Sequence, residues 1–196
     1  MPRTIDPVVT AFGSVAQPTF ELGDGLILRP FGFLDESIVR AAFSSPDIVR
    51  WHHFRVDTEA DAVAWIERTH AKWVQEESAD WLIEEGGVGV GRVGFHADAL
   101  RGNAEIAYWL LPSGRGRGLV TSAAYAVTEW AHDLRFHRVV LQHSLHNPAS
   151  CAVAARLGYS FEGTARQQDL HVDGWHDMHQ HAHVAGDSLT RTSPGG

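Results

Sequence analysis

A short loop rich in glycine and arginine is the clearest indication of chemistry in this sequence. It reads Gly114-Arg-Gly-Arg-Gly118 and joins a strand-like apolar segment to one with helical spacing of apolar residues. The first N–H groups of a helix lack partners within it and lie at the positive end of its dipole. Glycine lets the backbone approach a phosphate, and Arg115 and Arg117 add positive charge. The loop is therefore predicted to bind an anion, the alternative being a solvated turn. Neither the Gly-Lys-Ser/Thr ending of a P-loop nor GxGxxG spacing is present.

Histidines form a second unusual feature. The chain has 13, and His179, His181 and His183 alternate near its end. In a β-strand this spacing places three imidazoles on one face. Such a stripe could bind zinc, take part in acid–base chemistry or line a binding pocket, and the alternative is packed or surface histidines. Because the sequence offers no matched fourth ligand, no metal is expected.

Composition and charge limit the class of protein. The chain has 196 residues, of which 16 are basic and 24 acidic, giving a net charge of −8. This length suits one domain, and the negative charge argues against nucleic acid or an anionic membrane as a partner. No apolar run approaches the roughly 20 residues that span a bilayer. With the single cysteine Cys151 and no secretory signal pattern, a reducing cytoplasm is the expected location.

The elements that must position these residues follow from periodicity and turn residues. Residues 1–19 and 185–196 are expected to be loose tails flanking one domain over 20–184. Helices are expected after Asp35, from Thr58 to about Ser78, over 119–134 and over 147–157. Strands are expected at 25–29, 81–83, 88–95, 104–111 and 138–143, with a closing hairpin over 159–163 and 170–184. The three central strands follow one another without long crossovers, which predicts an antiparallel meander.

The loop and its flanks resemble a known family. Arg115-Gly-Arg-Gly118-Leu-Val120 is similar to the Arg/Gln-x-x-Gly-x-Gly/Ala signature of the GNAT superfamily of acyl-CoA-dependent N-acyltransferases, although Val120 stands where Gly or Ala is preferred. Residues 105–111 and 147–163 resemble its ribosomal-protein N-acetyltransferase branch, the RimJ/RimL type. The resemblance covers about residues 24–184. It implies an α/β fold with a mixed, mostly antiparallel central sheet, flanked by helices and splayed between its fourth and fifth strands, which end near Leu111 and His143.

The resemblance also implies where acetyl-CoA, or another acyl-CoA, binds. The cofactor would lie in the opening of the sheet, with its pyrophosphate on the loop amides and its pantetheine arm along the strand before the loop. The cofactor-binding residues implied in this way are Trp109, Leu110, Leu111, Arg115, Gly116, Arg117, Gly118, Val120, Thr121 and Asn147.

Two residues take catalytic roles by the same resemblance. Glu105 matches the position of a general base, and its alternative is an exposed or salt-bridged strand residue. Many family members protonate the leaving thiolate with a tyrosine, but Ala154 occupies that position here. Ser150 is then the candidate proton donor, with water as its rival. Cys151 is interpreted as a small core residue and Asn147 also as a helix N-cap.

The acceptor is expected to be a primary amine of a small molecule or of a protein N-terminus. Trp51, His52, His179 and His181 are the residues predicted to line its pocket. The predicted function is direct transfer of an acetyl or related acyl group to that amine, and a homodimer is possible. Two alternatives remain open: a non-catalytic acyl-CoA-binding or scaffold module, and a histidine-rich metal-binding protein on the same fold.

Overall fold

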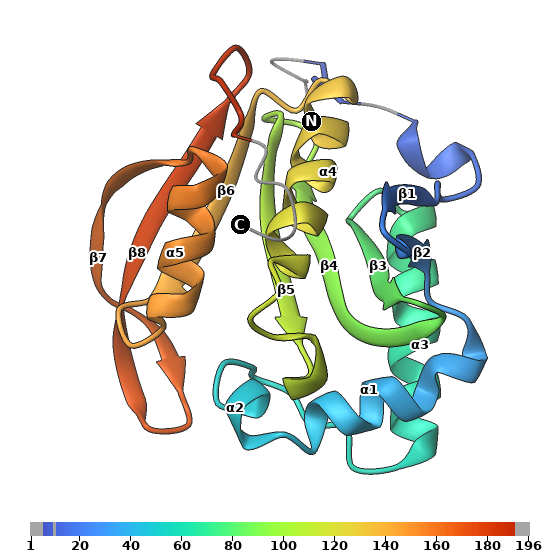
Figure 1. Cartoon of the computed structure of the whole chain (residues 1–196). Helices are drawn as coiled ribbons and strands as arrows, with labels where there is room; N and C mark the ends of the chain where they lie inside the picture. The colour runs from blue at the N-terminus through green and yellow to red at the C-terminus, as the bar shows by residue number, and fades with distance from the viewer. Residues whose placement is uncertain (1–5, 10, 191–196) are drawn as a thin grey trace, which may run out of the picture.

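The computed structural model describes residues 6–9 and 11–190, which contain one eight-stranded sheet in the order β1-β2-β3-β4-β5-β6-β8-β7. Figure 1 shows α4 and α5 side by side in front of this sheet. The strands are β1 Phe20–Gly23, β2 Leu26–Pro30, β3 Ser78–Glu85, β4 Val88–Asp98, β5 Asn103–Leu110, β6 Arg138–Ser144, β7 Ser160–His171 and β8 Gly174–Val184. The α-helices are α1 Glu36–Phe43, α2 Pro46–Val49, α3 Glu59–Val74, α4 Leu119–Asp133 and α5 Pro148–Leu157, and 3-10 turns cover Phe12–Ser14, Phe33–Asp35 and Pro112–Gly114.

Strands β3 to β5 form the predicted antiparallel meander, and β2 and the unpredicted β1 extend it at one edge. Successive side chains point to opposite faces, so each strand feeds two cores. Trp81 and Ile83 join a cluster with α4, while Leu82 between them joins a second cluster with α1 and α3. This alternation explains why both faces of the sheet are covered by helices.

The sheet opens between β5 and β6, as the family resemblance implies. These two strands are parallel, and their register pairs only residues 103–105 with 138–140. Both strands continue beyond this point, to Leu110 and Ser144, but they no longer pair with each other. Figure 1 shows them diverging toward the lower part of the view. With β1 counted as an edge strand, the gap lies between the fifth and sixth strands.

Local capping chemistry sets the helix starts that matter for the site. The Thr58 side chain accepts a hydrogen bond from the Asp61 N–H, and the Asp61 carboxylate accepts one from the Thr58 N–H, which is the capping box expected from the sequence. Helix α5 begins after Asn147 and ends at Gly158, whose φ of 81° is readily accessible to glycine. These caps fix the ends of α5 as predicted.

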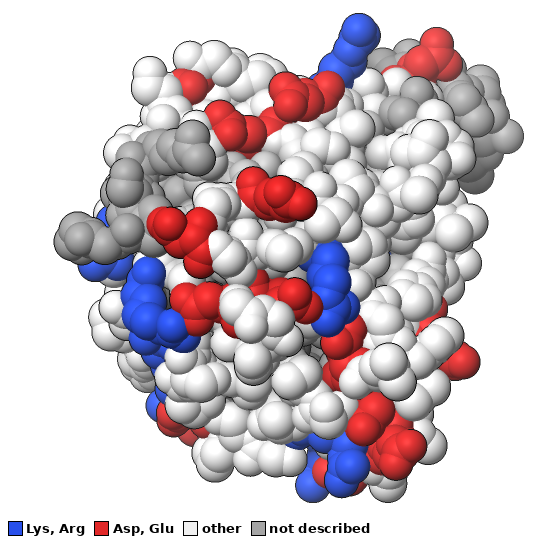
Figure 2. Space-filling model, turned by 45° about the vertical axis from the view of Figure 1, so that its right-hand side comes forward, with Lys and Arg blue, Asp and Glu red and all other residues white. Residues whose placement is uncertain are grey.

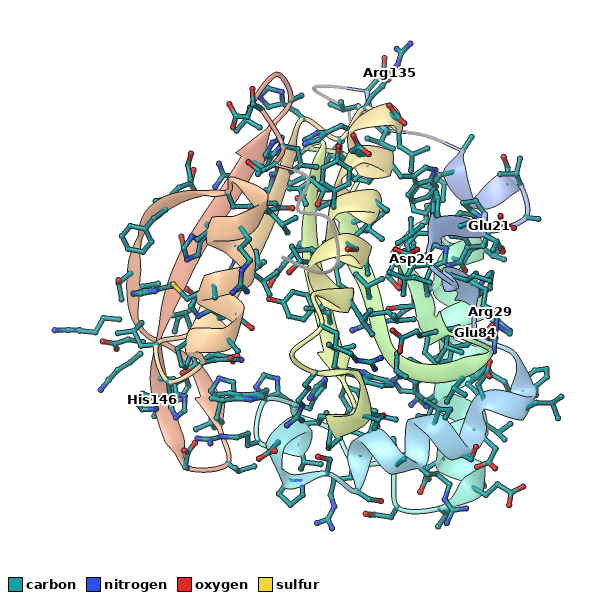
Figure 3. The ribbon with its side chains drawn as sticks, viewed as in Figure 1. Glu21, Asp24, Arg29, Glu84, Arg135 and His146 are labelled. Atoms are coloured by element: carbon teal, nitrogen blue, oxygen red, sulfur yellow. The ribbon has the colours of Figure 1, made fainter. Side chains whose placement is uncertain are left out.

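Asp35 precedes α1 as expected, but its side chain does not cap that helix. It accepts hydrogen bonds from Arg29 and from the Gly32 N–H, both at 2.7 Å. Burial alone would raise the pKa of Asp35, but these hydrogen bonds bring it below its usual value. Arg29 also binds Glu84 at 2.7 Å, and the two side chains are labelled in Figure 3. The pair of carboxylates on one arginine joins β2 and β3 to the turn before α1.

The described part of the expected N-terminal tail is packed, which corrects that expectation. Val9 and Phe12 are buried in the first core. The Phe12 ring lies 5.3 Å from Trp73 and 6.1 Å from Phe95, measured between centroids. Prolines and weak periodicity suggested loose chain, but one large aromatic residue is enough to anchor it.

The described part of the expected C-terminal tail is also attached. The Ala185 N–H donates to the His137 carbonyl at 2.7 Å, and the Thr190 N–H donates to the Leu157 carbonyl at 3.1 Å. Residues 1–5, 10 and 191–196 of the two expected tails lie outside the described residues. The domain limits at 20 and 184 stay a prediction.

On the face shown in Figure 2, basic side chains are scattered among acidic ones and form no continuous basic surface. None of the helices in the described residues is long and apolar enough to cross a membrane.

Candidate active site

A cavity of about 670 Å³ lies where β5 and β6 separate. Its walls come from both strands, the arginine–glycine loop, the start of α5, and the chain around α2 and β7. Nine of the residues predicted from sequence line it: Trp51, His52, Glu105, Trp109, Leu110, Arg115, Val120, Asn147 and Ser150. The sequence therefore identified residues from five separate segments that the fold brings together.

Strand β5 gives this cavity two sides. Tyr108 and Leu110 pack toward the core that contains α4, whereas Trp109 packs toward α1 and α3. By the alternation of a strand, Glu105 shares the face of Trp109. The cavity thus reaches both faces of the sheet, with the predicted base on one face and the predicted cofactor loop on the other.

The arginine–glycine loop presents free backbone donors. Gly116 and Gly118 have φ of 75° and 73°, and a β-carbon at either would meet no atom within 4 Å. Glycine is needed there for its backbone conformation rather than for space. Among the described residues, the N–H groups of residues 118–121 have no hydrogen-bond acceptor, and the first helical bond of α4 runs from the Ser122 N–H to the Gly118 carbonyl at 3.0 Å. These groups are unpaired donors at the positive end of α4, and anion binding by them stays a prediction.

Both arginines of the loop are occupied by carboxylates. Arg115 binds Asp47 at 2.9 Å, and Arg117 binds Glu85 and donates to the Ser113 carbonyl. Gly116, Arg117, Gly118, Thr121 and Leu111 are not among the cavity-lining residues. The guanidinium groups hold the loop in place, so an anion would meet mainly backbone N–H groups.

Val120 fits the site despite its departure from the family signature. Its side chain packs against the first core cluster and also forms part of the cavity wall. Its role as a cofactor contact stays a prediction.

Glu105 stands exposed on the cavity wall. The surrounding protein and then the nearby Asp169 carboxylate raise the pKa of Glu105 above its usual value. A carboxylate with a raised pKa is a stronger base near neutral pH. No salt bridge occupies Glu105 in the described residues, so the salt-bridged alternative does not hold there, whereas the alternative of an exposed strand residue stays open.

The first turn of α5 carries the candidate proton donor. The Asn147 side-chain oxygen accepts a hydrogen bond from the Ser150 N–H at 3.2 Å, which confirms its capping role. Ser150 is buried and lines the cavity. The Ser150 side chain lies beside Tyr108 of β5, where it partly offsets the effect of burial on the Tyr108 pKa.

Tyr108 is a functional candidate that sequence reasoning missed. It lines the cavity, and burial raises its pKa to about 12, an effect partly offset by the neighbouring Ser150 side chain. Its hydroxyl is buried and makes no hydrogen bond of normal geometry within the described residues. The available signal was its spacing three residues after Glu105, which puts it on the opposite face of the same strand.

The side of the cavity where an acceptor is predicted to bind contains more polar groups than expected. Trp51 and His52 are joined there by Gln168, Asp169 and His171 of β7. Burial lowers the pKa of both His52 and His171, which favours neutral rings. The β7 residues were missed because β7 pairs with β8 through irregular register shifts that the sequence does not reveal.

His179 and His181 do not line the cavity, which corrects the prediction of an acceptor-pocket role. The stripe does lie on one face of β8, but Met178, with opposite parity, is the β8 residue that lines the cavity. The two histidines pack instead with His143, Phe161 and each other on the α5 side. Alternation predicts that side chains share a face, but not which face is covered by a helix.

A mixed sheet that splits around a cavity, with a helix N-terminus at its edge, defines an α/β fold of the acyl-CoA-dependent transferase type. The chain belongs to the acetyltransferase (GNAT) domain family, whose model matches residues 25–160.

Similar proteins include members of the ribosomal-protein branch. The ribosomal-protein-serine acetyltransferase of Escherichia coli strain K12 is 31% identical over 97 residues, which are 48% of this chain and 54% of that protein. The match thus spans about half the length of this relative. In fold, the chain is similar to RimL, a ribosomal L7/L12 alpha-N-protein acetyltransferase solved with coenzyme A, with a TM-score of 0.79, 20% identity and coverage of 85% of this chain and 98% of that one. Mycobacterium smegmatis RimJ has a TM-score of 0.75, 21% identity and 82% coverage of each chain.

Proposed function

We propose that this protein transfers an acetyl or related acyl group from acyl-CoA to a primary amine, which attacks the thioester directly. One observation carries the proposal. A single cavity contains a carboxylate with a raised pKa, a buried serine and a tyrosine, and part of its wall is Val120, which belongs to the first turn of α4 with its unpaired N–H groups. A base, proton donors and an anion cradle are what amide formation from a CoA thioester requires of a protein.

The residues present fit acyl-CoA. The N–H groups of residues 118–121 would hold the pyrophosphate, and their preference for an anion does not depend on the arginines. Beyond Glu105, β5 pairs with β4 on one edge only, so its other edge is free to bind the pantetheine arm as an added strand would. Bound there, acyl-CoA supplies the acyl thioester.

Glu105 and Ser150 approach the reaction from opposite sides. Glu105 takes a proton from the incoming ammonium group, directly or through water, leaving the neutral amine that is nucleophilic. As the carbon–nitrogen bond forms and the carbon–sulfur bond breaks, Ser150 donates a proton to the departing sulfur and regains one, through water, from the nitrogen that becomes the amide. Water can replace Ser150 in this role. Tyr108 remains protonated at neutral pH, because its pKa is about 12, and supplies a second hydroxyl near Ser150.

The acceptor is proposed to be a protein N-terminal amine. Support comes from the name of the Escherichia coli relative, a ribosomal-protein-serine acetyltransferase, and from the carboxylates of Glu105 and Asp169 on the acceptor side. Negative charge there favours entry of a cationic amine. An enzyme with such an acceptor would act in the cytoplasm.

A panel of amines tests the proposal. Purified protein with acetyl-CoA is assayed for free CoA release with peptides beginning in Ser or Ala, with polyamines and with amino sugars. Turnover of the peptides supports the proposal, and turnover of only the small amines would replace the proposed acceptor. A protein that binds acetyl-CoA but acetylates no amine would favour the non-catalytic module, for which Ala154 at the usual tyrosine position is the motivating observation.

A further inference from the structure

Four metal-binding side chains meet beside the active-site cavity, and one of them, His143, also lines it. His143 of β6, His179 and His181 of β8, and Cys151 of α5 each place one potential ligand atom within 4.8 Å of the other three. We propose that these four residues form a Zn²⁺ site. Nothing in the acyl-transfer proposal requires it, and the two proposals can fail separately.

Sheet register explains how the three histidines come together. β6 and β8 are antiparallel, with His143 opposite His179 and Leu141 opposite His181. Residues two apart on a strand share a face, so all three imidazoles point to the same side. Helix α5 packs on the same side of the sheet, and Cys151 near its start brings its sulfur to the three imidazoles. The sequence showed the stripe but gave no indication of the third strand residue or of the cysteine.

The spacing of two ligand atoms fits tetrahedral coordination. Zinc binds histidine nitrogen at about 2.0–2.1 Å, so two nitrogens on one tetrahedral ion lie about 3.3–3.4 Å apart. Nε2 of His143 and Nε2 of His181 are 3.3 Å apart. Their rings are nearly parallel, at 19°, with centroids 5.3 Å apart.

Hydrogen bonding prepares His143 as a ligand. Its Nδ1 lies 2.9 Å from the Ser144 carbonyl oxygen, which only accepts, so Nδ1 carries the proton. In the neutral ring Nε2 then has a free lone pair directed toward His181. A backbone carbonyl is one of the common outer partners of a zinc-bound histidine, together with carboxylates and water.

Without an ion, the hydrogen-bonding groups of the His181 ring are not all satisfied. It is only 4% exposed, and its Nδ1 has no hydrogen-bond partner in the described residues. If its proton is on Nε2, a buried Nδ1 lone pair has no donor; if its proton is on Nδ1, two Nε2 lone pairs face each other. A cation between the two Nε2 atoms removes that repulsion.

The ligand types favour zinc. Three imidazoles and one thiolate form a nitrogen and sulfur set without a carboxylate, which suits Zn²⁺ and not Mg²⁺ or Ca²⁺. Four protein ligands would close the site, as in structural zinc centres.

Two other histidine clusters each contain a carboxylate, although neither ring nitrogen of the buried His171 in the first cluster has a hydrogen-bond partner in the described residues. In one, His53 pairs with Asp169 at 3.3 Å, and in the other His176 pairs with Asp173 at 2.9 Å. A carboxylate already satisfies a histidine in each. The cluster around His143 has no such carboxylate.

Metal binding is measured on the full chain without a histidine tag. The protein is stripped with a chelator, then titrated with Zn²⁺ against a chromophoric competitor and with Co²⁺ as a spectroscopic probe. We expect one equivalent of Zn²⁺, a rise in Tm on binding, and a thiolate-to-cobalt charge-transfer band. Cys151→Ser should abolish that band, and His179→Gln should weaken Zn²⁺ binding by more than about 10- to 100-fold, the loss seen when even an outer partner is removed.

The matched control is His137→Gln, which changes an exposed histidine outside the cluster and should leave the affinity unchanged. Circular dichroism of each variant shows that it is folded. Failure of the folded parent to bind one equivalent of Zn²⁺ overturns the proposal. So does a charge-transfer band that persists in Cys151→Ser, or an affinity that falls equally in His137→Gln and His179→Gln.

Discussion

Glu105 and Val140 are the last partners in the parallel register between β5 and β6. The sheet therefore opens at the candidate base, and the strand beyond it has a free edge. A carboxylate at this position belongs to the rigid paired part of the strand while its side chain reaches the cavity. This arrangement provides the positional control that a general base needs.

Replacing Glu105 with glutamine should lower kcat about 10²- to 10⁴-fold, the usual contribution of a general base, with little change in the KM for acyl-CoA. The loss should shrink at high pH, where the amine deprotonates without help. Steady-state kinetics with acetyl-CoA and a reactive amine measure both effects. Glu21→Gln changes an exposed strand glutamate far from the cavity and serves as the control (Figure 3). Parental turnover in Glu105→Gln would make Glu105 structural.

Asp169→Asn should move the acidic limb of the pH–rate profile to lower pH. The Asp169 charge contributes to the raised pKa of Glu105, and its removal makes the Glu105 anion easier to form. The base works when ionised, so activity falls as the pH drops through its pKa; a lower pKa extends activity toward acid. The profile of kcat/KM against pH tests this, with Asp24→Asn, at an exposed turn, as the control. A limb that stays in place would show that another group limits the rate there.

Gly118→Glu should abolish acyl-CoA binding. It adds bulk and negative charge where the backbone at the start of α4 must meet phosphate, and it strains a φ of 73°. Gly23→Glu imposes similar strain at φ 90°, also in open space, but on the edge strand β1, so it controls for backbone effects. Calorimetry with CoA compares the two. Equal affinity in both folded variants would remove the loop from the cofactor site.

Ser150→Ala should slow turnover modestly while acyl-CoA affinity is kept. An ordinary thiol titrates near about pH 8.5, so the thiolate can leave without full protonation, and water or Tyr108 can replace the serine. If the two hydroxyls substitute for each other, the fold-loss in kcat of the double variant Ser150→Ala, Tyr108→Phe should exceed the product of the fold-losses of the two single variants. Additive losses in kcat would instead show that Tyr108 does not act as the substitute donor.

The sequence predicted the parts of this molecule that depend on local chemistry. Capping at Thr58 and Asn147, the meander and the glycine-rich start of α4 follow from residue type and spacing. Glu105 and Ser150 required the family resemblance as well, and the structure brings both to one cavity while leaving their roles untested.

Features set by long-range packing were not predictable. Phe12 anchors the N-terminal segment through contacts with residues 61 to 124 positions away in the chain. The presence of Asp169 in the cavity depends on irregular pairing of β7, and the position of His181 depends on which face of β8 is covered by α5. In each case a local pattern is compatible with two arrangements, and only the assembled sheet distinguishes them.

The buried histidines should make the metal-free protein less stable below neutral pH. Burial lowers the pKa of His143, His181 and His183, whereas an unfolded histidine titrates near about 6.5. As the pH falls below that value, the unfolded chain binds protons that the folded chain does not, so the free energy of unfolding decreases. The effect is absent above about pH 7, where these groups are neutral in both states.

Urea unfolding between pH 7.5 and 5, with chelator present, measures this loss of stability. His183→Gln should reduce the slope by up to about 1.4 kcal/mol per pH unit, the value for one proton, while exposed His137→Gln should leave it unchanged. A free energy of unfolding that is constant across this range would show that the buried imidazoles accept protons in the folded state.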